Sequence, residues 1–191
     1  MEYIAEESGG YLMYYSTQYR SPVGGMLLAS DGEGIIGLWN EGQKYYGAGV
    51  KGERVNADEL PVLTAAKVWL DRYFAGEKPQ ISELRLNPGG SEFRKEVWNL
   101  LCEIPYGSYT TYGELAKKMA VRMDKESMSS QAVGGAVGHN PISVIIPCHR
   151  VVGTNGSLTG YAGGITKKIA LLEHEGARMQ DLFVPVRGTA L

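Results

Sequence analysis

The chain has 191 residues, of which 43% are hydrophobic and 21% are charged, and its formal net charge at pH 7 is −2. This composition is that of an ordinary globular protein and excludes disordered, collagen-like and low-complexity chains. No apolar run approaches the roughly 18 residues of a membrane helix, and the acidic first ten residues lack the apolar core of a signal peptide. We therefore expect a soluble, cytoplasmic protein with one large or two small domains.

Cysteine and histidine are scarce, with two and three residues respectively. Cys102 and Cys148 cannot form a disulfide framework. We do not expect a closed zinc site from so few ligands. The sequence thus predicts no metal and no cofactor, and each cysteine needs an explanation of its own.

Charge is distributed unevenly along the chain. Residues 1–90 carry 8 basic and 12 acidic side chains, whereas residues 91–191 carry 11 basic and 9 acidic ones. The segment 104–172 is the most basic, with 7 basic and 3 acidic side chains. This imbalance favours an anionic partner for the second half, although a chance fluctuation gives the same numbers.

The first half predicts strands followed by a helix. Three short runs have strand composition and suggest an antiparallel meander: residues 11–19, 23–29 and 34–40. Four apolar residues at helical spacing then predict a helix: Leu63, Ala66, Leu70 and Phe74. Gly76 and Pro79 end that helix. No chemical signature occurs in this half, so we expect residues 1–88 to be a scaffold domain, joined to the rest by the Asn-Pro-Gly-Gly linker at 87–90.

The second half predicts mostly helices. Ser91 is a candidate N-cap, and an apolar stripe follows it: Phe93, Val97, Leu100 and Leu101. Thr111 and Glu114 have the spacing of a capping box, which predicts a helix over residues 112–120. Ser129 or Ser130 then precedes a helix over residues 131–138. Two short helices joined by a turn are typical of a helix-turn-helix unit.

The second of these helices is rich in glycine. Gly134, Gly135 and Gly138 each destabilise a helix by roughly 0.5–1 kcal/mol relative to alanine. Glycines allow another backbone to come close. That backbone is either a packed helix or a nucleic-acid strand, and the sequence leaves both readings open.

Cys148 is the residue with the clearest chemical context. An apolar run over residues 142–146, which predicts a strand, leads to Pro147, Cys148, His149 and Arg150. Positive charge beside a cysteine lowers the pKa of the thiol and so favours the nucleophilic thiolate. A buried, inert cysteine is the alternative. Because successive strand side chains point to opposite faces, a direct contact between Cys148 and His149 is not assured.

Glu175 ends the last predicted helix, over residues 165–175, with Gly176 as the residue that follows it. A carboxylate at this end opposes the helix dipole. We therefore expect Glu175 to have a partner, and the alternative is a solvated surface glutamate. Residues 160–164, Gly-Tyr-Ala-Gly-Gly, predict a flexible loop that carries one aromatic ring.

Several motifs in one order resemble the O6-alkylguanine-DNA alkyltransferase family. They span residues 93–176 and comprise Tyr112-x-x-Leu115-Ala116, Ala-Val-Gly-Gly-Ala at 132–136, Asn140-Pro141, Ile-Pro-Cys-His-Arg-Val-Val at 146–152, Tyr161-x-Gly163-Gly164 and Leu-Leu-x-His-Glu-Gly at 171–176. The first half resembles the family only in size and in its strand-then-helix plan. The resemblance implies a ribonuclease-H-like α/β domain with a small antiparallel sheet and a helix. A mostly α, winged-helix-like domain with a helix-turn-helix follows at 91–178, and a tail at 179–191.

The resemblance also implies a reaction. Cys148 would attack the alkyl carbon on guanine O6 in one irreversible transfer that uses up the protein. His149 would accept the cysteine proton through a water, and Glu175 would orient His149. Asn140 would brace the cysteine turn, while Tyr112 would donate toward the departing base and help rotate the 3′ phosphate. The implied base pocket is lined by Val151, Tyr161, Ala162 and Gly163.

The implied partner is double-stranded DNA carrying O6-alkylguanine and, by extension, O4-alkylthymine. The family places the small-residue helix in the minor groove and flips the target nucleotide out of the stack. We expect weak sequence preference and a monomeric protein. The implied DNA contacts are Arg94, Gly113, Lys118, Gln131, Ala132, Gly134, Gly135, Arg150 and Thr154.

One residue departs from the family pattern. Gln131 stands where the family usually has an arginine that fills the hole left by the flipped base, and glutamine cannot supply that charge. Two rival functions are a non-catalytic sensor of alkylated DNA and a cysteine hydrolase. Sensors of that kind lack the cysteine, and hydrolases place nucleophile and base far apart in the sequence.

Overall fold

The computed structural model describes residues 13–186, and the N-terminal ten residues, together with the start of the first predicted strand, lie outside them. Strands β1 (Met13–Ser21), β2 (Gly24–Ser30) and β3 (Ile35–Asn40) form the predicted antiparallel meander. Strand β4 (Glu53–Asn56) pairs in parallel with β1, so that the sheet order is β3-β2-β1-β4. This strand was not predicted, because its four residues are mostly polar.

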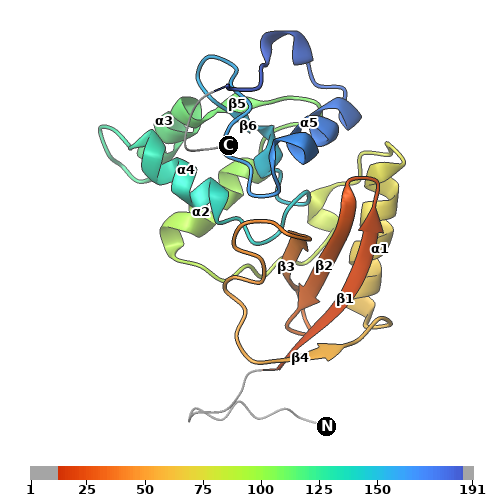
Figure 1. Cartoon of the computed structure of the whole chain (residues 1–191). Coiled ribbons are helices and arrows are strands. Elements are labelled where there is room, and N and C mark those ends of the chain that lie inside the picture. The colour runs from red at the N-terminus through yellow and green to blue at the C-terminus, as the bar shows by residue number, and fades with distance from the viewer. Residues whose placement is uncertain (1–12, 187–191) are drawn as a thin grey trace.

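Helix α1 (Pro61–Phe74) lies across one face of this sheet, as Figure 1 shows. Its buried face includes Leu63, Ala66 and Leu70, as the spacing predicted, and also Tyr73. Each fully buried leucine contributes about 1.5–3 kcal/mol. The chain leaves the helix at Gly76, whose φ of 83° suits glycine.

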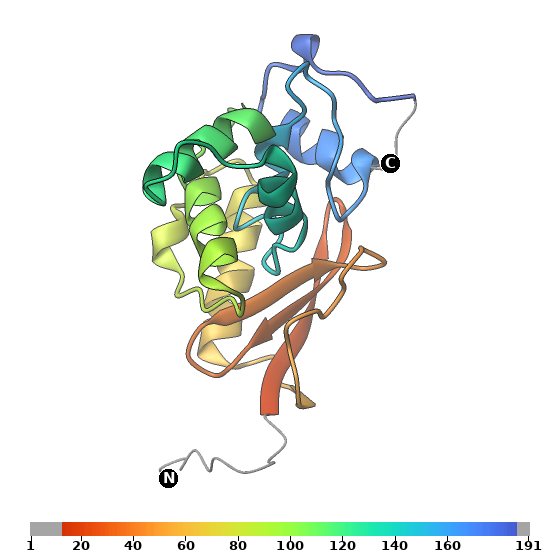
Figure 2. The ribbon, with the colours of Figure 1, turned by 90° about the vertical axis from the view of Figure 1, so that its left-hand side faces the viewer.

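The second half is mostly helical, as Figure 2 shows from the side. Its elements are α2 (Glu92–Cys102), α3 (Tyr112–Arg122), α4 (Ser130–Gly138) and α5 (Ile165–His174), with β5 (Thr110–Thr111) paired in parallel to β6 (Val151–Val152). The predicted N-caps are confirmed at Ser91, Thr111 and Ser129. The α3 capping box is complete, because the side chains of Thr111 and Glu114 each accept the backbone amide of the other.

The two halves share one hydrophobic core, which joins the sheet and α1 to α2, α3 and α4. The edge strand β3 makes a further backbone link. The Leu38 amide donates to Pro141, and the Ser143 amide donates back to Leu38, both at 2.8 Å. Within residues 13–186, no helix is both long and apolar enough to cross a membrane.

The prediction of a strand over residues 142–146 was wrong. This segment forms turns, and its β pairing is a single isolated bridge between Ile142 and Leu38. Val144 has a φ of 70°, which a regular strand does not allow. Its apolar side chains are nevertheless buried, so that composition alone suggested a strand. Cys148 itself lies in a short 3₁₀ helix, η2 (Cys148–Arg150).

Candidate active site

Asn140 organises the turn that precedes Cys148. Its Oδ1 accepts the Ile142 amide at 3.0 Å, and its Nδ2 donates to the Ile146 carbonyl at 2.8 Å. The same Nδ2 lies 3.1 Å from the Cys148 sulfur. One buried amide thus supplies the hydrogen bonds that a strand ladder would have supplied, and it also points a donor at the sulfur. This geometry agrees with the bracing role implied for Asn140.

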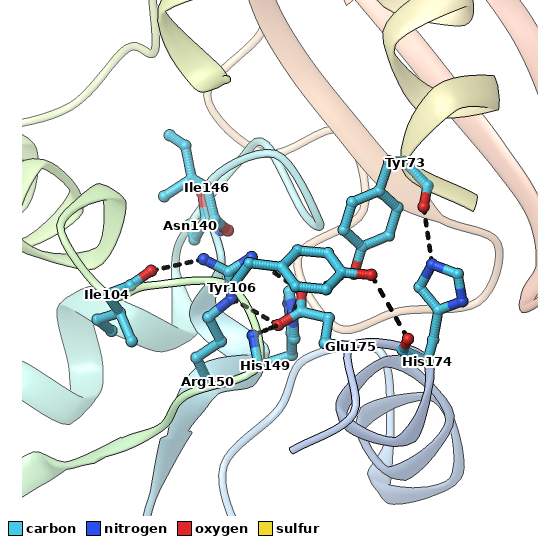
Figure 3. Close-up of polar contacts among 10 residues, drawn as sticks. Tyr73, Ile104, Tyr106, Asn140, Ile146, His149, Arg150, His174 and Glu175 are labelled. Atoms are coloured by element: carbon cyan, nitrogen blue, oxygen red, sulfur yellow. Dashed lines mark hydrogen bonds and ion pairs between the residues drawn. The ribbon is translucent and has the colours of Figure 1, made fainter. Parts of the chain in front are cut away.

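Glu175 is the centre of a buried polar network, as Figure 3 shows. Its Oε1 lies 2.7 Å from His149 Nε2 and accepts hydrogen bonds from the Tyr73 hydroxyl at 2.7 Å and Arg150 Nη2 at 2.9 Å. Its Oε2 accepts from Arg150 Nε at 2.8 Å and from the Gly107 amide at 3.2 Å. These partners hold the pKa of Glu175 far below its ordinary value despite burial. The alternative of a solvated surface glutamate was therefore wrong.

This carboxylate fixes the proton positions on His149. Because ionised Glu175 can only accept, Nε2 of His149 carries the hydrogen and Nδ1 has the lone pair. His149 is fully buried, and its Nδ1 has no hydrogen-bond partner among residues 13–186. Burial lowers the pKa of His149, although Glu175 opposes that shift. The ring is thus a neutral base with one free acceptor.

The electrostatics of Cys148 differ from the prediction. Burial is the largest influence and raises the pKa of its thiol, whereas Asn140 and Lys168 act in the opposite direction. Arg150 was expected to supply the positive charge, but its guanidinium is paired with Glu175. Lys168 supplies it instead, fully buried, with its ammonium group 2.5 Å from the Val151 carbonyl and 2.6 Å from that of Thr159. A buried thiol of raised pKa needs a base, and His149 follows it in the chain.

A hollow of about 340 Å³ lies between the glycines of α4 and the loop that carries Tyr161. Tyr161 and Ala162, which were predicted to line the base pocket, form part of its wall. Gly134 and Gly135 of α4, which were predicted to contact DNA, form another part of the same wall. The other lining residues are Lys44, Tyr45, Gly138, His139, Gly160 and Gly164. A larger hollow, of about 540 Å³, has Arg150 in its wall, and Cys148 lines neither of the two hollows.

Tyr112, the first residue of α3, contacts the loop that lines this hollow. Its hydroxyl lies 3.3 Å from the Thr159 carbonyl and 3.4 Å from that of Gly160. Burial and the nearby Cys148 raise the pKa of this hydroxyl, so it keeps its proton at neutral pH. The hydroxyl is thus a hydrogen-bond donor to the loop that lines the hollow.

Two family models match almost the whole of the described chain. Residues 13–88 match the ribonuclease-like domain of 6-O-methylguanine DNA methyltransferase, and residues 92–177 match the DNA binding domain of the same family. A methylated-DNA–protein-cysteine methyltransferase from Haemophilus influenzae is 44% identical over 161 residues, which is 84% of this chain and 86% of that protein. One from Methanosarcina acetivorans is 44% identical over 166 residues, or 86% and 99% of the two chains.

Solved structures of proteins from this family match the chain as well. The Mycobacterium tuberculosis OGT in complex with DNA matches with a TM-score of 0.71 and 37% identity, over 88% of this chain and 96% of that one. The M. tuberculosis O6-methylguanine methyltransferase matches with a TM-score of 0.71 and 35% identity, over 92% of this chain and 97% of that one. The chain belongs to the methylated-DNA–protein-cysteine methyltransferase family. Family and enzyme class are therefore those that the sequence predicted, and the two-part fold is confirmed.

In this methyltransferase, α4 leaves its glycine face open. A Cβ on Gly135 or Gly138 would meet nothing within 4 Å, and one on Gly134 would lie 3.6 Å from the Tyr112 ring. Of the two readings of the glycines, close helix packing therefore does not explain Gly135 or Gly138. Gln131 and Ala132 are exposed on the first turn of the same helix.

The other predicted DNA contacts separate into two groups. Gly113 and Thr154 are neighbours, since a Cβ on Gly113 would lie 3.9 Å from the Thr154 hydroxyl. Lys118 is exposed on α3, and Arg94 is half-buried in the first turn of α2. Arg150 does not belong with them. It is buried, bound to Glu175 and, at 2.6 Å, to the Ile104 carbonyl, so its role as a DNA contact is contradicted.

The predicted pocket residues Val151 and Gly163 do not line the hollow, and both have structural roles that the motif did not reveal. Val151 is fully buried, and its carbonyl accepts the Lys168 ammonium group. A Cβ on Gly163 would lie 2.6 Å from the Tyr161 ring, so only glycine allows this close approach. Within residues 13–186 no three metal-ligating side chains cluster.

Sequence reasoning also missed residues of the network. Tyr73 belongs to the half that was expected to be only a scaffold, yet it binds Glu175 directly. Its position three residues after Leu70 placed it on the inward face of α1. Lys168 likewise lies three residues before Leu171 on the buried face of α5. A polar residue on a predicted apolar stripe was the available signal in both cases.

Proposed function

We propose that this protein repairs alkylated DNA by transferring the alkyl group of O6-alkylguanine irreversibly to its own Cys148. The observation that carries the proposal is the free Nδ1 of His149, whose Nε2 is held by buried Glu175, next in the chain to a buried cysteine that lies 3.1 Å from Asn140 Nδ2. A neutral base and an aimed donor are what a thiol of raised pKa needs in order to react.

In the proposed reaction, a water passes the proton of Cys148 to His149 Nδ1, and Glu175 stabilises the imidazolium that forms. The sulfur then forms a bond with the alkyl carbon while the bond from that carbon to O6 breaks. The electron pair moves into the guanine, toward which the hydroxyl of Tyr112 would donate. The thioether product contains no good leaving group, so that each molecule acts once.

We further propose that the DNA lies across α4 with its minor groove against the glycine face. The open surface at Gly135 and Gly138 supports this, because bulky side chains there would keep a sugar–phosphate backbone away. Since O6 is buried in a duplex, the nucleotide would have to be flipped out into the hollow that Tyr161 and Ala162 line. Gln131 would fill part of the gap in the stack.

Several narrower statements belong to the same proposal. O4-alkylthymine is a second substrate, and the protein acts as a monomer with weak sequence preference. The functional units are residues 1–88 and 91–178. Residence in the cytoplasm and the absence of a cofactor stay predictions from the sequence. Of the predicted tail at 179–191, residues 179–186 are described, and the Phe183 carbonyl accepts the Leu158 amide of the second unit at 2.9 Å.

A turnover count tests this function. Duplex DNA with a labelled O6-methylguanine is mixed with less than one equivalent of protein. The proposal predicts that transfer stops at one methyl group per protein, and that Cys148→Ser binds the duplex without accepting the label. Binding without transfer by the wild-type protein would identify a sensor instead, and repeated turnover would identify a different enzyme.

A further inference from the structure

Strand β3 and the turn that follows it bond to two backbone segments of the second half. Besides the links of Leu38 to Pro141 and Ser143, the Lys44 amide donates to the Ala162 carbonyl at 3.1 Å. The N-terminal half thus contacts both the segment before Cys148 and the loop that carries Tyr161. Asn40 is the last residue of β3 and lies between these links.

Asn40 is fully buried, and its side chain has a defined direction. The carboxamide oxygen of Gln43 accepts the Asn40 backbone amide at 2.7 Å, Asn40 Nδ2 at 3.2 Å and the Ser143 hydroxyl at 3.3 Å. An amide oxygen can only accept. The Asn40 side chain must therefore turn its NH₂ group toward Gln43.

With this orientation, the NH₂ group of Asn40 also reaches the substrate pocket. Asn40 Nδ2 donates to the Tyr161 hydroxyl at 3.4 Å, and Ser143 hydrogen-bonds to the same hydroxyl. Gly163 makes the approach possible, because a Cβ there would lie 2.9 Å from Asn40 Nδ2 and 2.6 Å from the Tyr161 ring. The hydroxyl of the pocket aromatic is thus held from the N-terminal domain.

The other polar atom of this side chain is left unpaired. Asn40 Oδ1 is buried and has no hydrogen-bond partner among the described residues. Burying an unpaired carbonyl oxygen is unfavourable, and an apolar side chain of similar size would avoid that cost. The hydrogen bonds that Nδ2 donates to Gln43 and Tyr161 offset this cost.

We propose that Asn40 is a positioning residue for alkyl transfer: through its bond to the Tyr161 hydroxyl, it fixes the ring against which the alkylated base lies. This inference rests on the proposed function and adds to it a role for the N-terminal domain. Asn40 acts through Tyr161 and does not itself touch the reacting atoms.

The test is a double-mutant cycle on single-turnover transfer from duplex DNA carrying O6-methylguanine. Asn40→Ala and Tyr161→Phe should each lower the saturating transfer rate by roughly three- to tenfold, as expected for the loss of one neutral hydrogen bond. The double variant should be no slower than the slower single variant. Half-saturating protein concentration and affinity for unmodified duplex should stay at wild-type values.

Asn56→Ala is the matched control, because Asn56 is an exposed asparagine in β4 of the same sheet, and it should react at the wild-type rate. If Asn40→Ala fails to fold, Gln43→Ala releases the Asn40 amide and should give the same pattern with Tyr161→Phe. A wild-type rate for the Asn40 variant, or effects that multiply in the double variant, would overturn the positioning role alone. Absence of transfer by the wild-type protein would overturn the proposed function, and this inference with it.

Discussion

The hydroxyl of Tyr73 donates a 2.7 Å hydrogen bond to Glu175, although 102 positions separate the two residues in the sequence. Tyr73 lies on α1 of the N-terminal domain, and Glu175 follows α5 of the other. Burial and the nearby carboxylate raise the pKa of Tyr73, so its hydroxyl remains a donor at all physiological pH values. The N-terminal domain is thereby part of the network that holds the imidazole of His149.

Tyr73→Phe should lower the free energy of unfolding by about 1.5–3 kcal/mol, the range for a hydrogen bond to a charged group. The reason is that Glu175 loses one of its buried donors without a change in side-chain volume. Urea denaturation measures the effect. Tyr46→Phe is the control, because Tyr46 is 44% exposed and should change little. Equal stability of the Tyr73 variant and the wild type would show that this bond contributes nothing.

Glu175→Gln should destabilise the protein by about 3–5 kcal/mol at pH 7, because it leaves Arg150 buried without its counter-charge. The pKa of Glu175 in the folded protein lies below its ordinary value of 4.5. Its contribution to stability is therefore complete above about pH 5 and is lost as the pH falls through the folded-state pKa. The stability difference between wild type and variant should narrow from pH 7 to pH 3.

Denaturant titrations at both pH values measure that difference. Glu173→Gln, an exposed glutamate on the same helix, should stay within about 0.5 kcal/mol of the wild type at both. If the difference in unfolding free energy between Glu175→Gln and the wild type is the same at pH 3 and pH 7, Glu175 is not an ionised partner of Arg150.

The rate of methyl transfer should not rise above neutral pH. Burial lowers the pKa of His149 from 6.5, so the imidazole is already the free base at pH 7. Transfer at saturating DNA should therefore fall below pH 6.5 and should not increase from pH 7 to 8.5. Burial lowers the pKa of Lys168 to about 8, so the loss of its charge near Cys148 slows transfer at the upper end of this range. His149→Gln should be slow and should speed up with pH, because the Cys148 thiol must then ionise unaided. A wild-type rate that climbs tenfold per pH unit across this range would exclude His149 as the base.

Gly135 offers a test that separates folding from DNA binding. Gly135→Ala should stabilise α4 by roughly 0.5–1 kcal/mol, since the added methyl group meets no neighbour. Gly135→Leu should also fold stably but bind duplex DNA at least about tenfold more weakly, a loss of ~1.4 kcal/mol. Thermal unfolding and a DNA titration measure the two effects. Undiminished binding by the leucine variant would place the DNA elsewhere.

The sequence predicted those features that depend on near neighbours. The capping box of Thr111 and Glu114, the caps at Ser91 and Ser129 and the meander all follow from residues a few positions apart, and all are present. The motif around Cys148 was specific enough to identify the family, because several separate patterns occurred in one order.

The features that sequence reasoning missed depend on distant contacts. Arg150 looked like a free cation because its partners Glu175 and Ile104 are 25 and 46 positions away. Asn40 and Tyr161 are 121 positions apart, and no local pattern joins them. The segment before Cys148 was predicted as a strand from its apolar composition. That composition does not show that the side chain of Asn140 binds the Ile142 amide and the Ile146 carbonyl, which a neighbouring strand would otherwise bind.

The most direct test of transfer to Cys148 is the intact mass of the protein after reaction with a short duplex that carries O6-methylguanine. The account predicts a gain equal to one CH₂ group, limited to one per protein and mapped by peptide digestion to Cys148. Cys148→Ser should show no gain. An unchanged mass for the wild-type protein, or an adduct on Cys102 that persists in Cys148→Ser, would contradict it.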